Sequence, residues 1–253
     1  MPCRVSIIVP TLNEATSLGR TLRCLSILEP GAWEIIVVDG GSEDETIAIA
    51  QTAAQTLLQA IPVTIIRLGD AGRSRQLQRG AEVATGEVLC FLHADTIVPD
   101  DLVQVIEQTL SDETVAAGGF IALMTGTNTT RWSVSLHNFL KTYYAPLLFR
   151  PYQFFAKGLR LLFGDQVMFC RRETYQQCGG FDPKVAILEE ADLCAKLVRF
   201  GRIRQVNRVV QSSDRRVAKW GVLKATGIYL MIGFLWGLGV PSKFLKRFYE
   251  DVR

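Results

Sequence analysis

Acidic side chains stand just after apolar runs at three places in the first hundred residues. The runs occupy residues 5–9, 35–38 and 88–92, and the carboxylates that follow them are Glu14, Asp39 and Asp95. Buried parallel strands are near-continuous apolar runs, and open α/β sheets bind ligands beyond the carboxyl ends of their strands. We therefore expect three strands that deliver polar residues to one edge of a sheet, and this edge is the candidate active site.

A second group of acidic residues, Glu189, Glu190 and Asp192, precedes Leu193 and Leu197, which recur at helical spacing. Adjacent carboxylates repel each other, and this repulsion raises a pKa towards neutral pH. Such a carboxylate can act as a general base if it reaches an acceptor hydroxyl at hydrogen-bond distance. The start of this predicted helix is therefore a second candidate for the chemistry.

Four segments, taken together, resemble family 2 inverting glycosyltransferases, which have the GT-A nucleotide-sugar fold. They are Val5–Glu14, Val37–Thr46, Gly72–Thr96 and Gly164–Asp192. The run Leu-His-Ala-Asp-Thr at 92–96 is similar to that of a short bacterial branch of the family. Each pattern alone is weak, but four in the right order and spacing are specific, and the resemblance extends to about Gly201.

The resemblance implies that a sugar moves from a nucleotide-diphosphate sugar, with a UDP-sugar expected, to an acceptor hydroxyl by single displacement with inversion. A divalent cation, Mn²⁺ or Mg²⁺, would neutralise the departing pyrophosphate, and Asp95 is its expected ligand. Family members usually carry Asp-x-Asp where this chain has His93-Ala94-Asp95. His93 is either a metal ligand or ribose contact, or a packed strand residue.

The resemblance also implies a set of residues that bind the nucleotide sugar. They are Pro10, Thr11, Asn13, Glu14, Asp39, Gly40, Arg75, His93, Ala94, Asp95, Gly164 and Asp165. Asp39 is expected to accept from a pyrimidine N3–H, although an Asp before Gly-Gly also caps turns. Arg75 could touch base or phosphate, while Arg73 is expected to be a solvated surface residue. A basic residue in 213–216 could approach the pyrophosphate, or belong to a surface cluster.

Glu190 aligns with the family's catalytic aspartate and is the expected general base. Glu189 is the second choice, and Asp192 is expected to be a solvated helix residue or cap. The alternative is a nucleotide-sugar-binding pseudoenzyme, suggested by His93 and by a glutamate at position 190. A sugar nucleotidyltransferase would need a Gly-rich basic loop after the first strand, and a dinucleotide oxidoreductase would need G-x-G-x-x-G there; residues 10–14 have neither.

Composition agrees with an enzyme of small substrates. The 253 residues are 48% hydrophobic and carry a net charge of +3, with basic residues dispersed except near the C-terminus. This charge does not suit a nucleic-acid binder. Six cysteines show no C-x-x-C spacing, so reduced thiols are expected, and no signal sequence is recognised. We expect a cytoplasmic enzyme, with contact to the inner face of a membrane and homo-oligomerisation left open.

Strand and helix patterns alternate through the first two thirds of the chain, which predicts an α/β fold with a mainly parallel sheet flanked by helices and a C-terminal helical segment. Later strands are predicted at 63–68, 115–125 and 167–170, and helices at about 14–28, 44–58, 74–84, 100–110 and 189–200. Gly86 is expected to end the third helix as a left-handed C-terminal residue.

Two segments differ from the rest. Residues 131–163 are aromatic and basic, and we expect them to lie over the acceptor side of a GT-A domain spanning 1–215. Residues 216–253 form a C-terminal helical extension, packed on the domain or at a membrane surface. Its uncharged stretch at 225–240 is shorter than the about 20 apolar residues of a membrane span and holds several glycines, so a buried or interfacial helix is favoured. The acceptor is open: a lipid-linked molecule and a small soluble one both fit.

Overall fold

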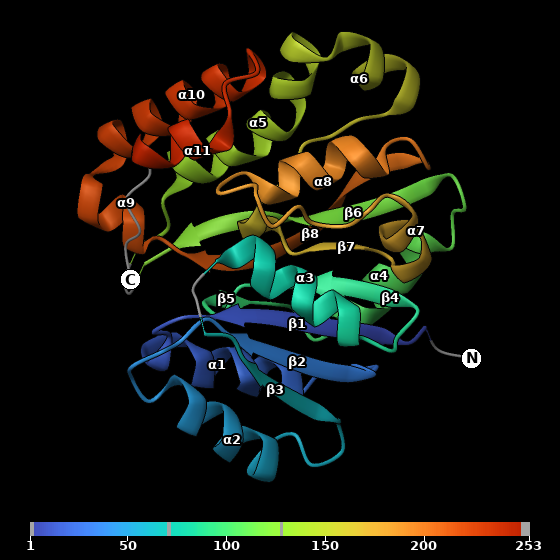
Figure 1. The fold of residues 1–253 in the computed structure, drawn as a ribbon, viewed down its shortest axis with the longest axis vertical. Coiled ribbons are helices and arrows are strands. Elements are labelled where there is room, and N and C mark those ends of the chain that lie inside the picture. Colours follow the sequence, from blue (N-terminus) through green and yellow to red (C-terminus); the bar gives the residue numbers. More distant parts are fainter. Residues whose placement is uncertain (1–2, 70–71, 127–128, 249–253) are drawn as a thin grey trace.

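One sheet carries the candidate site. The computed structural model describes residues 3–69, 72–126 and 129–248, and in these residues eight strands form a sheet of order β3-β2-β1-β4-β7-β6-β8-β5 (Figure 1). The strands are β1 (Val5–Thr11), β2 (Glu34–Asp39), β3 (Val63–Arg67), β4 (Val88–Phe91), β5 (Thr96–Ile97), β6 (Val115–Thr125), β7 (Met168–Arg171) and β8 (Arg202–Ser213).

Helices lie on both faces of this sheet. The α-helices are α1 (Ala15–Ser26), α2 (Thr46–Thr56), α3 (Arg73–Val83), α4 (Leu102–Leu110), α5 (Trp132–Phe149), α6 (Pro151–Lys157), α7 (Arg172–Gln177), α8 (Glu189–Leu197), α9 (Arg215–Trp220), α10 (Val222–Gly237) and α11 (Ser242–Leu245). Two 3₁₀ turns, η1 (Gly164–Gln166) and η2 (Lys246–Phe248), complete the described elements. The α/β prediction is confirmed.

The N-terminal strands are parallel, as the apolar runs predict. β3, β2, β1 and β4 pair in parallel, and Thr11 lies opposite Asp39 at the end of β1 and β2. Every residue of β1 and β2 is buried, because helices cover both faces of this part of the sheet. The polar residues that follow the strands therefore meet at one edge.

The second half of the sheet is mixed, and this reversal builds the rest of the site. β7 lies antiparallel between β4 and β6, with Phe91 opposite Met168. The start of an antiparallel strand lies beside the end of its partner. Consequently η1, which precedes β7, lies beside the residues that follow β4. Sequence alternation predicts a mainly parallel sheet, and three of the described pairings, β4–β7, β6–β7 and β5–β8, are antiparallel.

One turn differs from its predicted form. Gly86 does not end α3 as a left-handed residue: α3 ends at Val83, and Ala84 is already extended. Gly86 is required for a different reason, since a β-carbon there would lie 2.5 Å from Ser6 Oγ and 2.6 Å from the carbonyl oxygen of Arg4. All six cysteines lie in the described part of the chain, and none is paired there, while the reduced state of their thiols stays a prediction.

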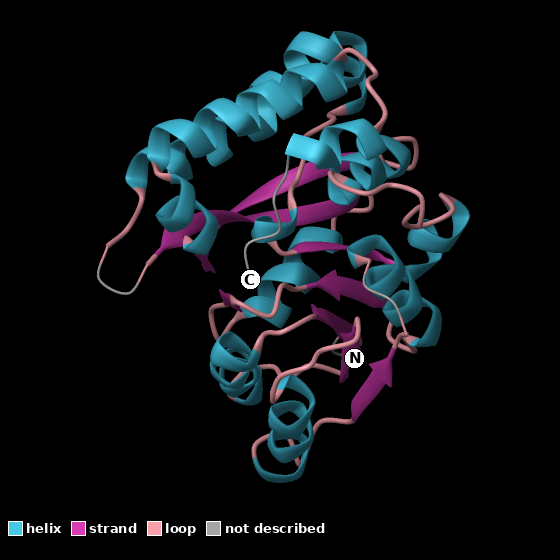
Figure 2. Cartoon of the chain, turned by 60° about the vertical axis from the view of Figure 1, so that its left-hand side comes forward, coloured by secondary structure: helices cyan, strands magenta, loops and turns pink. Residues whose placement is uncertain are grey.

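Helices α5, α6, α9, α10 and α11 form a layer over the C-terminal half of the sheet (Figure 2). α5 and α10 run side by side in the same direction, because Val134 and Ala225 pack together near their starts and Phe149 meets Phe234 near their ends. No helix in the described ranges combines the length and apolar character needed to cross a membrane.

Gly86→Ala should destabilise the fold, because the carbonyl of Arg4 is backbone and cannot yield to a new methyl group. We expect a loss of about 1–3 kcal/mol in the free energy of unfolding, the scale of overpacking in a dense interior. Urea denaturation measures it. Gly31→Ala is the control, since its nearest atom would be 3.9 Å away; equal stability of the two variants would contradict the packing role of Gly86.

Candidate functional site

A cavity of about 420 Å³ lies between the carboxyl edge of the sheet and the helical layer. One part of its wall is polar and comes from the ends of β1 and β4, from η1 and from the start of α8. The other part is mostly apolar and comes from α5 and α10, although α5 also contributes Asn138 and Lys141. A concave site with few convergent polar groups and an apolar wall is typical of a small-molecule site.

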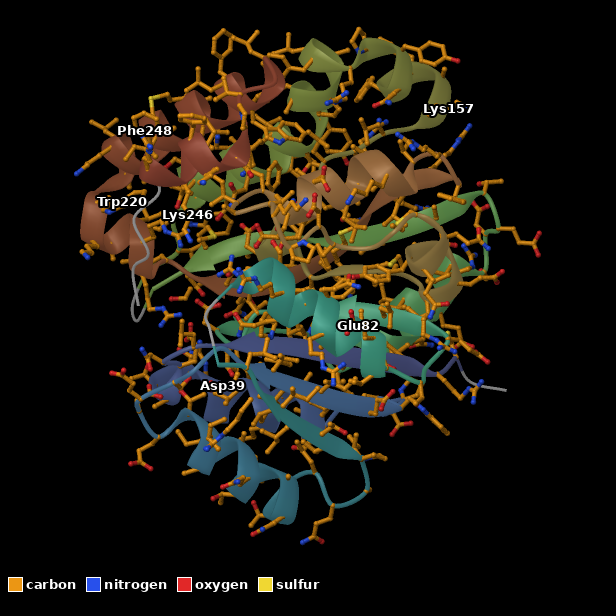
Figure 3. All side chains as sticks on the ribbon, in the orientation of Figure 1. Asp39, Glu82, Lys157, Trp220, Lys246 and Phe248 are labelled. Carbon is orange, nitrogen blue, oxygen red and sulfur yellow. The ribbon has the colours of Figure 1, made fainter. Side chains whose placement is uncertain are left out.

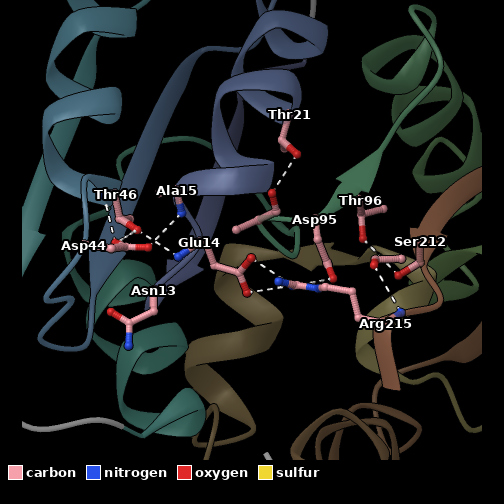
Figure 4. Close-up of polar contacts among 12 residues, drawn as sticks. Asn13, Glu14, Ala15, Thr21, Asp44, Thr46, Asp95, Thr96, Ser212 and Arg215 are labelled. Atoms are coloured by element: carbon pink, nitrogen blue, oxygen red, sulfur yellow. Dashed lines mark hydrogen bonds and ion pairs between the residues drawn. The ribbon is translucent and has the colours of Figure 1, made fainter. Parts of the chain in front are cut away.

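Arg215 joins two of the predicted carboxylates across this edge (Figure 4). Its Nη2 donates to Asp95 Oδ2 at 2.8 Å and to Glu14 Oε2 at 2.8 Å. Burial raises the pKa of Glu14, even though the hydrogen bond from Arg215 opposes the shift. The guanidinium supplies the positive charge that lets two carboxylates approach each other at a partly buried position.

The residues at this edge fit a cation that substrate phosphates would complete. In the described ranges, no three His, Cys, Asp or Glu side chains meet as a ready-made metal cage. Mg²⁺ in phosphate sites takes one or two carboxylates and completes its shell with phosphate oxygens and water. Asp95 lines the cavity, and the buried Nε2 of His93 has no hydrogen-bond partner among the described residues.

His93 and Glu190 face each other across Gly164. His93 Nε2 lies 3.7 Å from Glu190 Oε1, and neither atom has a hydrogen-bond partner in the described part of the chain. A β-carbon on Gly164 would lie 2.6 Å from Glu190 Oε1 and closer still to the imidazole. Burial lowers the pKa of His93 to about 4, so the imidazole is neutral near pH 7, and burial raises the pKa of Glu190.

Glu189 precedes this carboxylate in the first turn of α8. Burial raises its pKa to about 7, and repulsion by Glu190 adds to the shift, while Arg73 opposes it. Arg73 Nε lies 3.8 Å from Glu189 Oε1. The first turn of a helix favours negative charge, which offsets part of the cost of placing two buried carboxylates there.

Asp165 is held from the helical layer. Asn138 Nδ2 donates to Asp165 Oδ2 at 2.6 Å, and Lys141 Nζ donates to Asn138 Oδ1 at 3.1 Å. Lys141 also lies 3.6 Å from the ring centroid of Phe163. Burial lowers the pKa of Lys141, although Asp165 and Glu190 attract its charge. Segment 131–163 thus contributes polar residues to the cavity as well as aromatic ones.

Asp39 is engaged in a turn. Its oxygens accept hydrogen bonds from the backbone N–H groups of Gly41 and Ser42, at 3.0 and 2.9 Å, and from the hydroxyls of Thr11 and Ser42. A carboxylate has about four acceptor positions, so this set occupies the group. Asp39 does not line the cavity, and the turn-cap interpretation describes its present contacts.

Three non-glycine residues in the described chain have positive φ, and each adjoins a segment of the site. They are Asn13 (φ 53°), Val167 (φ 48°) and Leu188 (φ 62°). Left-handed backbone is unfavourable for Val and Leu, and such strain gathers at functional sites. Leu188 directly precedes Glu189 and Glu190, so its conformation sets where α8 begins.

The structure brings together most of the residues predicted from sequence. Cavity-lining members of that set are Pro10, Thr11, Glu14, His93, Ala94, Asp95, Gly164, Asp165, Glu189 and Glu190. Asn13, Asp39, Gly40 and Arg75 lie off the cavity wall, so their predicted contacts with the nucleotide sugar stay predictions.

Four polar residues of the cavity were underrated or missed. Arg73 lines the cavity and Arg75 does not, which reverses the sequence-based preference. Asn138 and Lys141 lie within a segment that is rich in aromatic residues. The available signal was their spacing of three residues, which places two polar side chains on the same side of a helix. Arg215 was expected either near pyrophosphate or in a surface cluster, and it lies at the edge beside Asp95.

Comparison with known sequences gives a family match. The model of the family described as Glycosyl transferase family 2 matches residues 6–178. A PGL/p-HBAD biosynthesis glycosyltransferase of Mycobacterium tuberculosis is 42% identical over 90 residues, 36% of this chain and 34% of that protein. An undecaprenyl-phosphate 4-deoxy-4-formamido-L-arabinose transferase of Pseudomonas aeruginosa is 26% identical over 174 residues, 67% of this chain. The match spans about half of that second protein's length and a third of the first.

Solved structures share the fold. A mannosyltransferase of Pyrobaculum calidifontis, in complex with GDP-Man and Mn²⁺, aligns with a TM-score of 0.71 and 21% identity over 94% of this chain and 64% of that one. A glucosyl-3-phosphoglycerate synthase of Mycobacterium tuberculosis, in complex with Mn²⁺, UDP-glucose and phosphoglyceric acid, aligns with a TM-score of 0.63 and 18% identity over 94% of this chain and 81% of that one. The expected GT-A fold is confirmed.

The raised pKa of Glu189 should appear in the pH dependence of stability. Its value rises from 4.5 to about 7 in the folded protein, so the folded state holds this proton more tightly than the unfolded state. The resulting stability is fully present below pH 4.5 and is lost as pH rises through 7. Glu189→Gln keeps a neutral side chain, and it should therefore gain stability over the wild type as pH increases.

We expect that gain to be about 1–3 kcal/mol between pH ~5 and pH ~8, from urea denaturation of variant and wild type at each pH. Glu173→Gln is the control because Glu173 is exposed. A stability difference between Glu189→Gln and wild type that did not change with pH would show that Glu189 is ionised at its ordinary pKa.

Proposed function

The chain belongs to glycosyl transferase family 2, and on that premise we propose that it moves a hexose-type sugar from a nucleotide-diphosphate sugar to an acceptor hydroxyl by single displacement with inversion. One observation carries the proposal: a single cavity is lined by the strand-end carboxylate Asp95 and by Glu190, whose buried Oε1 has no hydrogen-bond partner among the described residues. A donor's leaving group and an acceptor's proton need two such separate carboxylates.

Glu190 is the proposed general base. A base works best when its pKa lies near the working pH, and burial raises the pKa of Glu190 in that direction. Its Oε1 accepts no hydrogen bond from the described residues, and His93 Nε2 lies 3.7 Å from it. Arg73 and Lys141 oppose this rise in the pKa of Glu190, because their positive charges favour the ionised carboxylate that a base requires.

Asp95 and His93 are the residues that would hold Mn²⁺ or Mg²⁺. The bound cation would stabilise negative charge on the departing diphosphate. Arg215 supplies a fixed positive charge at the same edge, 2.8 Å from Asp95 Oδ2, and would contribute to binding the same anionic group. Arg73 adds a second guanidinium on the cavity wall near Glu189.

A UDP-sugar is the donor that we propose, with Pro10, Thr11 and Glu14 on the cavity wall near the nucleotide. One structural neighbour was solved with UDP-glucose and another with GDP-Man, so the fold accepts either base. If Asp39 accepts from a pyrimidine N3–H, one of its four present hydrogen bonds must be released.

Replacing Asp95 with Asn should impair activation of the donor while leaving the fold intact. We expect Asp95→Asn to lower transfer by about 10²-fold or more, the scale of losing one electrostatic contact to the transition state. Mn²⁺ should also no longer strengthen UDP binding, which calorimetry measures without turnover. Glu113→Gln, an exposed acidic position, is the matched control. Mn²⁺-strengthened UDP binding in Asp95→Asn would refute the metal assignment.

The general base is tested by paired amide substitutions. Glu190→Gln should bind UDP as the wild type does and lose about 10²- to 10⁴-fold in transfer rate. Glu189→Gln should lose less, because Arg73 holds that carboxylate. The reverse order would make Glu189 the base. If the wild type binds a UDP-sugar but never releases UDP in any acceptor extract, the pseudoenzyme alternative replaces the transferase.

A further inference from the structure

Exposed apolar side chains are concentrated on the helical layer. In the described ranges, nineteen large apolar side chains are exposed, and fourteen of them belong to residues 132–155 and 223–248. These fourteen are Trp132, Leu136, Leu140, Leu147, Leu148, Tyr152, Phe155, Leu223, Leu230, Met231, Phe234, Leu238, Phe244 and Phe248. Large contiguous apolar surface marks an interaction site.

Helix α10 is the clearest member of this layer. Its sixteen residues hold one charge, Lys224, yet only Ala225 and Ile232 of the helix, all of it described, are buried. A helix that is apolar on every side is normally enclosed by protein or lipid. Leu223, 89% exposed, and Leu230, Phe234 and Leu238 follow one another at spacings of seven, four and four residues, so they share one side of α10.

Charge is distributed as unevenly as apolar surface. Residues 131–163 and 215–248 hold 12 of the chain's 28 basic residues and none of its 25 acidic residues. The remaining chain has 16 basic and 25 acidic residues. Exposed basic side chains of the layer are Arg150, Lys157, Lys219, Lys224, Lys243, Lys246 and Arg247. Figure 3 shows Lys157, Lys246 and Phe248 on the layer, with Asp39 on the other half of the molecule.

The cavity opens onto this same surface. Leu148, Leu230 and Phe234 line the cavity and are also 67%, 47% and 56% exposed. The same cavity is lined by Asp95, Glu189 and Glu190. A molecule with an apolar tail and a hydroxyl could therefore lie with its tail between α5 and α10 and its hydroxyl beside Glu190.

We propose that the helical layer docks on an anionic lipid bilayer without crossing it, and that the acceptor is an amphiphilic alcohol taken from that surface; the acceptor part rests on the proposed transferase function. Apolar side chains would enter the interface, while the basic residues meet anionic headgroups. In the transfer, the anomeric carbon–diphosphate oxygen bond breaks and an anomeric carbon–acceptor oxygen bond forms. The diphosphate leaves with the electron pair, and Glu190 takes the hydroxyl proton.

Charge selects this occupant over a second copy of the chain. In a two-fold dimer the same patch of each copy meets itself. All charged residues of this patch are basic, so positive charges would face positive charges. Like charges that meet at such an interface repel each other and oppose the dimer. An anionic bilayer supplies both an apolar interior and the opposite charge, and each basic residue near it is attracted to the surface.

Vesicle co-sedimentation of the full chain tests the docking. We expect binding to vesicles of phosphatidylcholine with phosphatidylglycerol, and at least about tenfold weaker binding to phosphatidylcholine alone. Leu223→Glu with Phe155→Glu should weaken binding by about tenfold or more, since charge is costly in the apolar interface. The double variant Lys224→Glu with Lys243→Glu should lose only the additional vesicle binding that phosphatidylglycerol provides. None of these four positions lines the cavity.

Ile27→Glu is the matched control, because Ile27 is 65% exposed but lies outside the layer. It should bind vesicles as the wild type does, and circular dichroism should show that all variants fold. Equal loss in Ile27→Glu, or no vesicle binding by the wild type, would overturn the docking. A dimer that Leu223→Glu dissociates, without vesicle binding, would assign the layer to a second copy instead.

The acceptor class is tested with labelled nucleotide sugars offered to total-lipid vesicles and, separately, to a water-soluble metabolite extract. We expect label to enter the organic phase, and the Glu190→Gln variant to abolish it. Labelled sugar found only in water-soluble products would contradict the proposal of an amphiphilic acceptor. Vesicle binding without transfer to either extract would refute the transferase function, and the acceptor with it, while supporting the docking.

Discussion

Two carboxylates converge at the sheet edge, and the positive charge between them organises the molecule. Arg215 reaches Glu14 after β1 and Asp95 after β4, and it is the first residue of α9. Without a cation, the two acids would repel each other in a partly buried place. The contact therefore fixes the start of the C-terminal helices relative to strands that lie 120 and 201 positions away in the chain. Any ligand that binds Asp95 must share or replace this charge.

The two adjacent glutamates at the start of α8 have different surroundings. Glu189 and Glu190 are buried side by side, and the positive φ of Leu188 places both in the first helical turn. Arg73 Nε lies 3.8 Å from Glu189 Oε1, whereas the residue that faces Glu190 Oε1, at 3.7 Å, is the neutral His93. Gly164 makes this close approach sterically allowed. The site thus separates two chemically identical side chains into one held by an ion pair and one open to the cavity.

Sequence patterns predicted the strand ends well because apolar runs locate buried parallel strands, and a parallel arrangement leaves one choice of ligand edge. Sequence patterns were less informative about side chains whose positions depend on how the helices pack. The choice of Arg73 over Arg75 depends on which side of α3 faces α8, and Arg73 is the residue that lies beside Glu189 there. Asn138 and Lys141 reach the cavity through the packing of α5. The Gly-Gly after Asp39 indicates the turn contacts of this carboxylate, but it does not indicate the hydrogen bond from Thr11, which comes from a neighbouring strand.

The separation of charge between the helical layer and the rest of the chain also bears on encounter, before any contact forms. With basic residues on one side and an acidic excess on the other, the molecule carries a permanent electric dipole. Near an anionic surface, within about one Debye length of ~10 Å, this dipole experiences a torque that turns the basic side inward. Approaches with the acidic side facing the surface are repelled. The uneven charge distribution therefore orients the molecule before contact and raises the fraction of encounters that lead to binding.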